Sequence, residues 1–278
     1  MSLRNGVLTV DDERAGIEGE YRAAQRPFFA IRLSGQDLNV GRMSQGLAVG
    51  HAMDSLSLIA GWTALHDYDL TVESDRMILG AWHLSNPLFE IQSQDGLAQI
   101  TDARAGLPGG TLEVNGDLTV TEDASLMAIQ ARIEIDQLSS TLAAAGIPLD
   151  AEGVGQILIE PYTGGLSEGF AQGTLRFFDG EMNTLAEVRA AMGVEPERRF
   201  DMLDGSFIVG SDGLVFPQLR VHRDGEILEF DDLRLDAFRV LAGQARLQSG
   251  RGEEKTIVLS GTLQQPRLLD GMEAPRTQ

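Results

Sequence analysis

The chain has 278 residues, of which 42% are hydrophobic and 6% aromatic, so it can bury a sizeable core. Its formal net charge of −20 argues against nucleic acid as a partner, because no basic stripe is present to neutralise phosphates. The absence of cysteine excludes disulfides and thiolate metal sites, and no run approaches the roughly 18 apolar residues that a membrane-spanning helix needs.

The N-terminal third predicts β-strands from its start. Residues Gly6–Val10 read as a strand, and the segment before Ile17 lacks the apolar run of a signal peptide. We therefore expect the chain to be a soluble portion of a longer protein. Further on, Phe29, Ile31 and Leu33 alternate with smaller or polar residues. Because successive strand residues point to opposite faces, this alternation predicts a strand with one apolar face.

The middle third repeats the alternating pattern around a turn signal. Leu112 and Val114 precede Asn115-Gly116, and a second apolar pair follows at positions 118 and 120. Asparagine and glycine both tolerate the positive φ of a tight turn, so this dipeptide predicts a β-hairpin.

Two short amphipathic helices are predicted between strands. The first covers Asp136–Ala145, with an aspartate N-cap and Gly146 at its end. The second covers Thr184–Met192, where Thr184 and Glu187 have the spacing of a capping box and Gly193 ends the helix. The apolar stripe of the second helix consists of Leu185, Val188 and Met192.

The C-terminal third contains the clearest alternation in the chain. Apolar residues occupy every second position in three runs separated by Gly- and Asp-rich turns, which predicts a series of strands with one apolar side. The alternating pairs are Leu175/Phe177, Leu219/Val221 and Leu233/Leu235.

The order of strands, short helix and strands recurs, which indicates repeat architecture. Residues 151–156 and 162–165 are rich in glycine and read as loops. They suggest a boundary near residue 150, with one β-rich unit over 1–150 and a second over 151–278, although the sheet could run straight through it.

Signals for catalysis or metal binding have simpler explanations. Gly165–Gly169 matches the G-x-S-x-G nucleophile elbow and His222 lies downstream, but strand sequence follows where that motif requires a helix. The other histidines, His51, His66 and His83, show no ligand spacing. Acidic runs such as 11–13 and 231–232 lack the spacing of a calcium loop and read as solvated turns. We therefore expect no enzymatic activity, no cofactor and no metal.

Three large aromatic residues, Trp62, Tyr68 and Trp82, fall in one stretch of the first half. A platform for sugars is one interpretation. Packing on a strand face, or a position at the rim of an apolar groove, suits them better, because Trp and Tyr favour sites where one end is dry and the other wet.

Three glycine-spaced segments resemble the C-terminal region of AsmA-like proteins. They read G-x-L-x-x-x-x-G at Gly173–Gly180, L-x-G-x-F-x-V at Leu203–Val209 and L-x-G-T-L-x-x-P at Leu259–Pro266. The resemblance implies a Gram-negative envelope protein whose β-sheet curls into an apolar groove. It also implies roles in phospholipid movement and outer-membrane biogenesis, with an N-terminal anchor in the inner membrane that this sequence does not contain.

From these observations we expect a mainly β fold with a few short helices, built as an elongated, repeat-based antiparallel sheet curled into an apolar groove. The expected function is a non-enzymatic, periplasmic lipid-binding or lipid-transport segment. Its partners would be phospholipid or another acyl-chain lipid, together with inner- or outer-membrane proteins. The alternatives are a scaffold with a closed core and a glycan-active β-solenoid or sandwich. The groove candidates are Phe29, Ile31, Leu33, Leu112, Val114, Leu175, Phe177, Leu219, Val221, Leu233 and Leu235.

Overall fold

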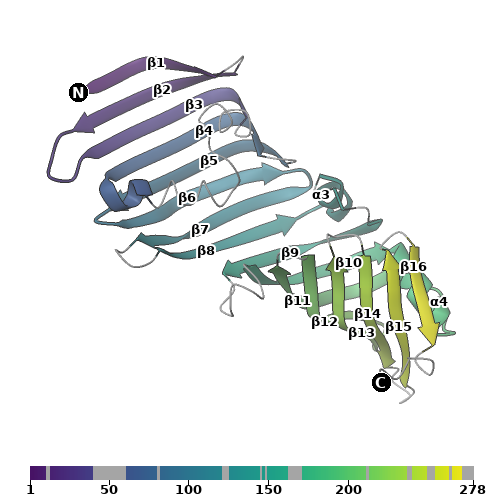
Figure 1. Ribbon diagram of the computed structural model, residues 1–278. Helices are drawn as coiled ribbons and strands as arrows, with labels where there is room; N and C mark the ends of the chain where they lie inside the picture. The colour runs from purple at the N-terminus through teal and green to yellow at the C-terminus, as the bar shows by residue number, and fades with distance from the viewer. Residues whose placement is uncertain are drawn as a thin grey trace. The chain divides into compact units, whose positions relative to one another are not determined.

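The computed structural model shows a mainly β protein with short helices (Figure 1). It describes residues 1–10, 13–39, 61–79, 82–120, 125–144, 146–147, 149–161, 171–210, 213–236, 240–248, 254–262 and 265–270. The chain divides into two compact units, Met1–Arg132 and Ile133–Gln278. This division precedes the boundary suggested near residue 150.

In the first unit the strand order follows the chain order. The strands are β1 (Ser2–Val10), β2 (Glu13–Arg22), β3 (Phe28–Asn39), β4 (Asp67–Leu79), β5 (Trp82–Gln94), β6 (Leu97–Leu107), β7 (Gly110–Val120) and β8 (Ser125–Ile135), which ends in the second unit. A helical turn at residues 61–65 precedes β4. The strand predicted at Gly6–Val10 is confirmed as part of β1.

The second unit also follows chain order, with its helices between strands. Its elements are α3 (Leu138–Ala144), β9 (Ala151–Pro161), β10 (Ala171–Met182), α4 (Asn183–Ala191), β11 (Arg199–Gly210), β12 (Gly213–Arg223), β13 (Glu226–Asp236), β14 (Val240–Gln248), β15 (Glu254–Thr262) and β16 (Gln265–Asp270).

One described pair of neighbouring strands in the first unit is parallel. Strands β3 and β4 pair in parallel, with Phe29 opposite Tyr68 and Leu33 opposite Val72. Two parallel neighbours cannot be joined by a tight hairpin, so the chain must return to the starting end of β3 before β4 begins. The helical turn at 61–65 lies on this return path.

The hairpin predicted at Asn115-Gly116 is wrong, because β7 continues through both residues. The tight turn lies earlier, where Leu107 pairs with Gly110 and Gly109 has φ 79°. Gly116 uses its positive φ of 147° inside the strand. A Cβ there would lie 2.3 Å from the carbonyl oxygen of Ala128, so glycine lets β8 approach closely.

Both predicted helices exist, but their N-termini differ from the prediction. The first begins at Leu138, and the carbonyl of Gln137 accepts its first hydrogen bond from the amide of Thr141. The second begins at Asn183, so Met182 occupies the N-cap position and makes no side-chain cap bond. The predicted capping box at Thr184 is therefore wrong.

The C-terminal glycines and the apolar stripe of α4 are confirmed. Gly146 and Gly193 have φ of 69° and 66°, the left-handed conformation typical of helix ends. The stripe of Leu185, Val188 and Met192 is buried.

The loop predicted at residues 151–156 is wrong, because these residues open strand β9. Their glycines serve pairing rather than turning. Gly155 lies opposite Phe177 of β10, and a Cβ at Gly155 would lie 2.2 Å from the carbonyl oxygen of Arg176 and 2.7 Å from the Phe177 ring. The second predicted loop, 162–165, lies outside the described residues.

Candidate functional site

The groove candidates of the second unit lie on one apolar face that the protein itself covers. Phe177, Leu203, Val221 and Leu228 are paired in turn from β10 to β13, so their side chains form one row across the strands. A parallel row contains Leu175 and Leu219. Leu175 packs against this core, while the other candidates here are buried within it: Phe177, Leu219, Val221, Leu233 and Leu235.

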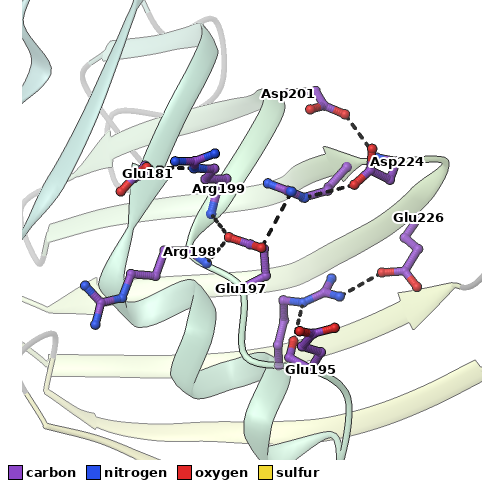
Figure 2. Close-up of polar contacts among 10 residues, drawn as sticks. Glu181, Glu195, Glu197, Arg198, Arg199, Asp201, Asp224 and Glu226 are labelled. Carbon is purple, nitrogen blue, oxygen red and sulfur yellow. Dashed lines mark hydrogen bonds and ion pairs between the residues drawn. The ribbon is translucent and has the colours of Figure 1, made fainter.

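Helix α4 packs on this face and is fastened there by two cations. Arg189 donates from Nε to the carbonyl of Glu195 and pairs with Glu226 at 2.9 Å, close enough for a charge-assisted hydrogen bond (Figure 2). Lys255, the only lysine in the chain, donates from Nζ to the carbonyl of Met192 at 2.8 Å. A cation at this end of a helix satisfies a free carbonyl and complements the helix dipole.

The segment after α4 is tied to the neighbouring strand ends by a cluster of ion pairs (Figure 2). One carboxylate oxygen of Glu197 accepts hydrogen bonds from the backbone amides of Arg198 and Arg199. The bond from the Arg199 amide is the main reason that the pKa of Glu197 lies below its usual value. Arg199 also pairs with Glu181, and Arg223 lies 3.5 Å from Glu197. These contacts fasten the segment to the sheet.

The groove candidates of the first unit lie on a face that is less covered. Phe29, Ile31 and Leu33 of β3 and Leu112 and Val114 of β7 are all only partly buried. Cross-strand pairing extends the face over several strands, and register shifts between β5 and β6 interrupt the simple alternation of side chains. One row is Gly19, Ile31, Leu70, Ile91, Ile100 and Gly116, and the next is Ile17, Leu33, Val72, Phe89 and Ala103.

On the opposite face of the first unit, β3 and β4 are joined by ion pairs. Arg32, adjacent to Ile31 and Leu33, forms a bidentate pair with Glu73 at 2.8 and 2.9 Å. This contact is the main reason that the pKa of Arg32 is raised. Arg76 pairs with Asp37 farther along the same two strands. The predicted division into an apolar and a polar face is thus confirmed in β3.

An aromatic cluster occupies one end of the apolar face in the first unit. The Phe29 ring lies 5.1 Å from Tyr21, 5.5 Å from Trp62 and 5.3 Å from His66, measured between ring centroids. The Trp62 and His66 rings also lie 5.2 Å apart, tilted by 42°. Sequence reasoning singled out Trp62 but missed its association with Tyr21 and His66. The contacts of Phe29 with Trp62 and His66 depend on the parallel pairing of β3 with β4, for which the sequence carries no local signal. Tyr21 reaches Phe29 through the antiparallel pairing of β2 with β3.

The helical turn that carries Trp62 is held firmly. Arg26 donates to the carbonyls of Thr63 and Ala64 at 2.7 and 2.9 Å, and it pairs with Asp67 at 2.8 Å. The hydroxyls of Thr63 and Tyr68 lie 2.9 Å apart in a buried hydrogen bond. The turn is therefore fixed by side chains on both sides of it.

The two tryptophans do not form a joint platform. Trp62 contacts Phe29, which pairs with Tyr68 at the start of β4, whereas Trp82 pairs with Leu79 at the end of β4. The length of a strand of 13 residues therefore separates them. Of the three interpretations considered for these residues, a sugar platform, packing on a strand face and a rim position, the geometry favours a rim position for Trp62.

The described histidine and acidic residues considered for catalysis or metal binding lie in separate places. His222 Nε2 lies 2.9 Å from Asp204 Oδ1 between β12 and β11, and both side chains are partly exposed. Asp231 pairs with Arg246. The stretch Gly165–Gly169, His51 and residues 11–12 lie outside the described residues. Within the described residues, no group of three or more His, Asp or Glu side chains is placed to hold a metal ion.

No family model, no curated protein and no solved structure matches the chain. Among the helices of the described part of the chain, none combines the length and apolar character needed to cross a membrane.

Proposed function

We propose that the chain is a non-enzymatic, lipid-binding segment of a bacterial envelope protein, and that the apolar face of the first sheet shields acyl chains. The observation that supports this proposal is the incomplete burial of that face. Ile31, Leu33, Leu70, Val72 and Ile91 are neighbours across three strands and all remain partly exposed. A contiguous apolar surface that remains partly exposed is a typical feature of a binding site.

The chemistry of the face suits an acyl chain. Its two central rows contain aliphatic residues, Phe89, alanine and glycine, with no charged side chain. Such a surface gives a ligand apolar contact, and the side chains of the surface form no hydrogen bonds with the ligand. Each buried methylene contributes about 0.8 kcal/mol, so ten methylenes contribute on the order of 8 kcal/mol before the costs of binding. This is enough for capture without recognition of a particular headgroup.

A periplasmic location, a role in outer-membrane biogenesis and contact with inner- or outer-membrane proteins follow from the AsmA-like resemblance. The resemblance is the sole basis for these three parts of the proposal. The net charge of −20 fits a contact with lipid through an apolar face, since the molecule as a whole repels anionic surfaces.

A second candidate function is a structural β-scaffold, and the packed face of the second unit favours it. There the groove candidates lie in or against the buried core, and the apolar stripe of α4 belongs to the same cluster. A scaffold would hold no lipid on either unit, whereas the lipid proposal assigns binding to the first unit.

The experiment is extraction and native mass spectrometry of protein purified without detergent from a Gram-negative host, followed by titration with a fluorescent phospholipid. Two neighbouring residues of β4 provide a matched pair of variants. Leu70→Asn places an amide on the apolar face, and Thr71→Asn places the same amide on the polar face. The Leu70→Asn variant loses most of one leucine contact with the lipid, so its binding should be about tenfold weaker. The Thr71→Asn variant should bind lipid as tightly as the unsubstituted protein.

The result that would overturn the proposal is a folded protein that carries no lipid and takes up no fluorescent phospholipid. The scaffold would then be the better account. Circular dichroism melts of both variants establish that the comparison is made between folded proteins.

A further inference from the structure

Along the strand direction, the apolar face of the first unit changes character in three steps. The aromatic end contains Tyr21, Phe29, Trp62 and His66. The open middle contains the two partly exposed rows through Ile31 and Leu33. The closed end contains Leu38, Met77 and Leu84, which are 3%, 4% and 3% exposed and belong to the cluster against which Val72 and Phe89 pack.

The aromatic end is amphipathic. Trp62 is 42% exposed and Tyr21 37% exposed, so both rings meet solvent while packing on Phe29. The Nδ1 atom of His66 is buried and has no hydrogen-bond partner among the described residues. Indole and phenol rings favour the boundary between apolar and polar surroundings. In a lipid, this boundary lies where the acyl chains meet the glycerol and the headgroup.

This end is also preformed. Arg26 holds the carbonyls of Thr63 and Ala64, and the Thr63–Tyr68 hydrogen bond secures the turn from within. Residues that are already fixed before binding lose little conformational freedom when a ligand arrives. A rigid aromatic rim is therefore suited to position one part of a ligand.

The closed end cannot accept a polar group. Leu38, Met77 and Leu84 pair across β3, β4 and β5 and pack with Ala15 and Ala105 in one cluster. A headgroup forced against these side chains would lose its hydrogen bonds to water without replacement, which is unfavourable. An acyl terminus has no such requirement, so it can approach this end from the open middle.

The dimensions fit one lipid. From Phe29 to Leu38 the strand rises about 30 Å, at roughly 3.3 Å per residue. One leaflet accounts for about half of the roughly 30 Å hydrocarbon core of a bilayer, so a lipid tail needs about 15 Å. The tail can therefore lie over the open middle with its terminus toward the closed end, while the headgroup region stays at the aromatic end.

From these observations we infer that a bound phospholipid lies along the strands of the first sheet in one orientation. Its headgroup is at the Trp62–His66 cluster, and its acyl ends point toward Met77 and Leu84. This inference rests on the proposed function and adds to it a direction of the ligand and a role for the aromatic cluster.

The two tryptophans of the chain report this orientation, because they lie at opposite ends of β4. Trp82→Phe leaves Trp62 as the sole indole, and Trp62→Phe leaves Trp82. Each variant is titrated with two phosphatidylcholines, one with a nitroxide on the headgroup and one brominated near the acyl terminus. The headgroup quencher should reduce Trp62 fluorescence more than Trp82 fluorescence, and the acyl quencher should do the reverse.

The outcomes separate the two proposals. The affinity for phosphatidylcholine is measured separately, by competition of the unlabelled lipid with a fluorescent phospholipid. This measurement does not depend on the fluorescence of either tryptophan. If lipid binds but both quenchers affect the two indoles equally, or in the opposite order, the orientation is wrong and the lipid-binding function stands. If no lipid binds to the parent protein, the proposed function fails and the orientation fails with it.

Discussion

A substitution at Gly173 tests how closely the strands of the second unit are packed. Gly173 of β10 lies between Ile159 of β9 and Phe207 of β11. A Cβ at this position would lie 2.1 Å from the carbonyl oxygen of Leu158 and 2.5 Å from Cζ of Phe207. The substitution Gly173→Ala therefore forces both a backbone group and an aromatic ring to move.

The expected cost follows from these two conflicts. Adding a methyl group to a well-packed core typically costs about 1–3 kcal/mol. The Leu158 carbonyl belongs to the β-ladder and cannot rotate away, so we expect a value at the upper end of that range. For a chain of this size, each kcal/mol lowers the melting temperature by about 2–4 °C, giving a decrease of about 6–12 °C near the upper limit.

The assay is thermal unfolding followed by circular dichroism, with Gly61→Ala as the control. A Cβ at Gly61 meets nothing within 4 Å, and alanine favours the helical conformation found there. Adding Phe207→Leu to Gly173→Ala should restore part of the lost stability, because it removes the ring but not the carbonyl conflict. If Gly173→Ala melts together with the parent protein, the close approach of β9 and Phe207 to this glycine is refuted.

Two further predictions concern the same unit. Leu228 is 1% exposed, so Leu228→Ala should cost about 2–5 kcal/mol in chemical denaturation, whereas a cost below about 1 kcal/mol would contradict its place in the core. The hydrogen bond from Gln218, assisted by Arg220, lowers the pKa of Glu229. A lowered pKa in the folded state stabilises the fold above the unfolded value of about 4.3, and this stabilisation is lost as the pH falls through the folded pKa. The stability difference between the parent and Glu229→Gln should therefore shrink from about pH 6 to pH 3, and a difference independent of pH would refute this account.

Alternation in the sequence was enough to predict a β-rich fold with one apolar face per sheet. Phe177, Leu219 and Val221 occupy the positions expected from their spacing, because the period of a strand is set by local backbone geometry. The glycine spacing of β10 also has a physical reason in the structure. Gly173 lies opposite Phe207 and Gly180 opposite Phe200, so each glycine leaves room for a ring from the next strand.

Local signals failed where a nonlocal partner decided the conformation. Asn115-Gly116 has the composition of a hairpin turn, yet the close approach of β8 to Gly116 makes it part of a strand. Residues 151–156 read as a loop because of their glycines, but β10 supplies the pairing that makes them β9. Composition defines which conformations a residue tolerates, and the neighbouring strand selects among them.

The sequence by itself determined which residues form the apolar face of each sheet, since side-chain alternation follows from the strand backbone. Only the tertiary structure decided whether that face is covered. In the second unit, α4 lies on it and is fastened by Lys255, which is 63 residues from Met192 in the chain. In the first unit, the rows through Ile31 and Leu33 remain partly exposed. Coverage depends on contacts between segments far apart in sequence, and no local periodicity encodes such contacts.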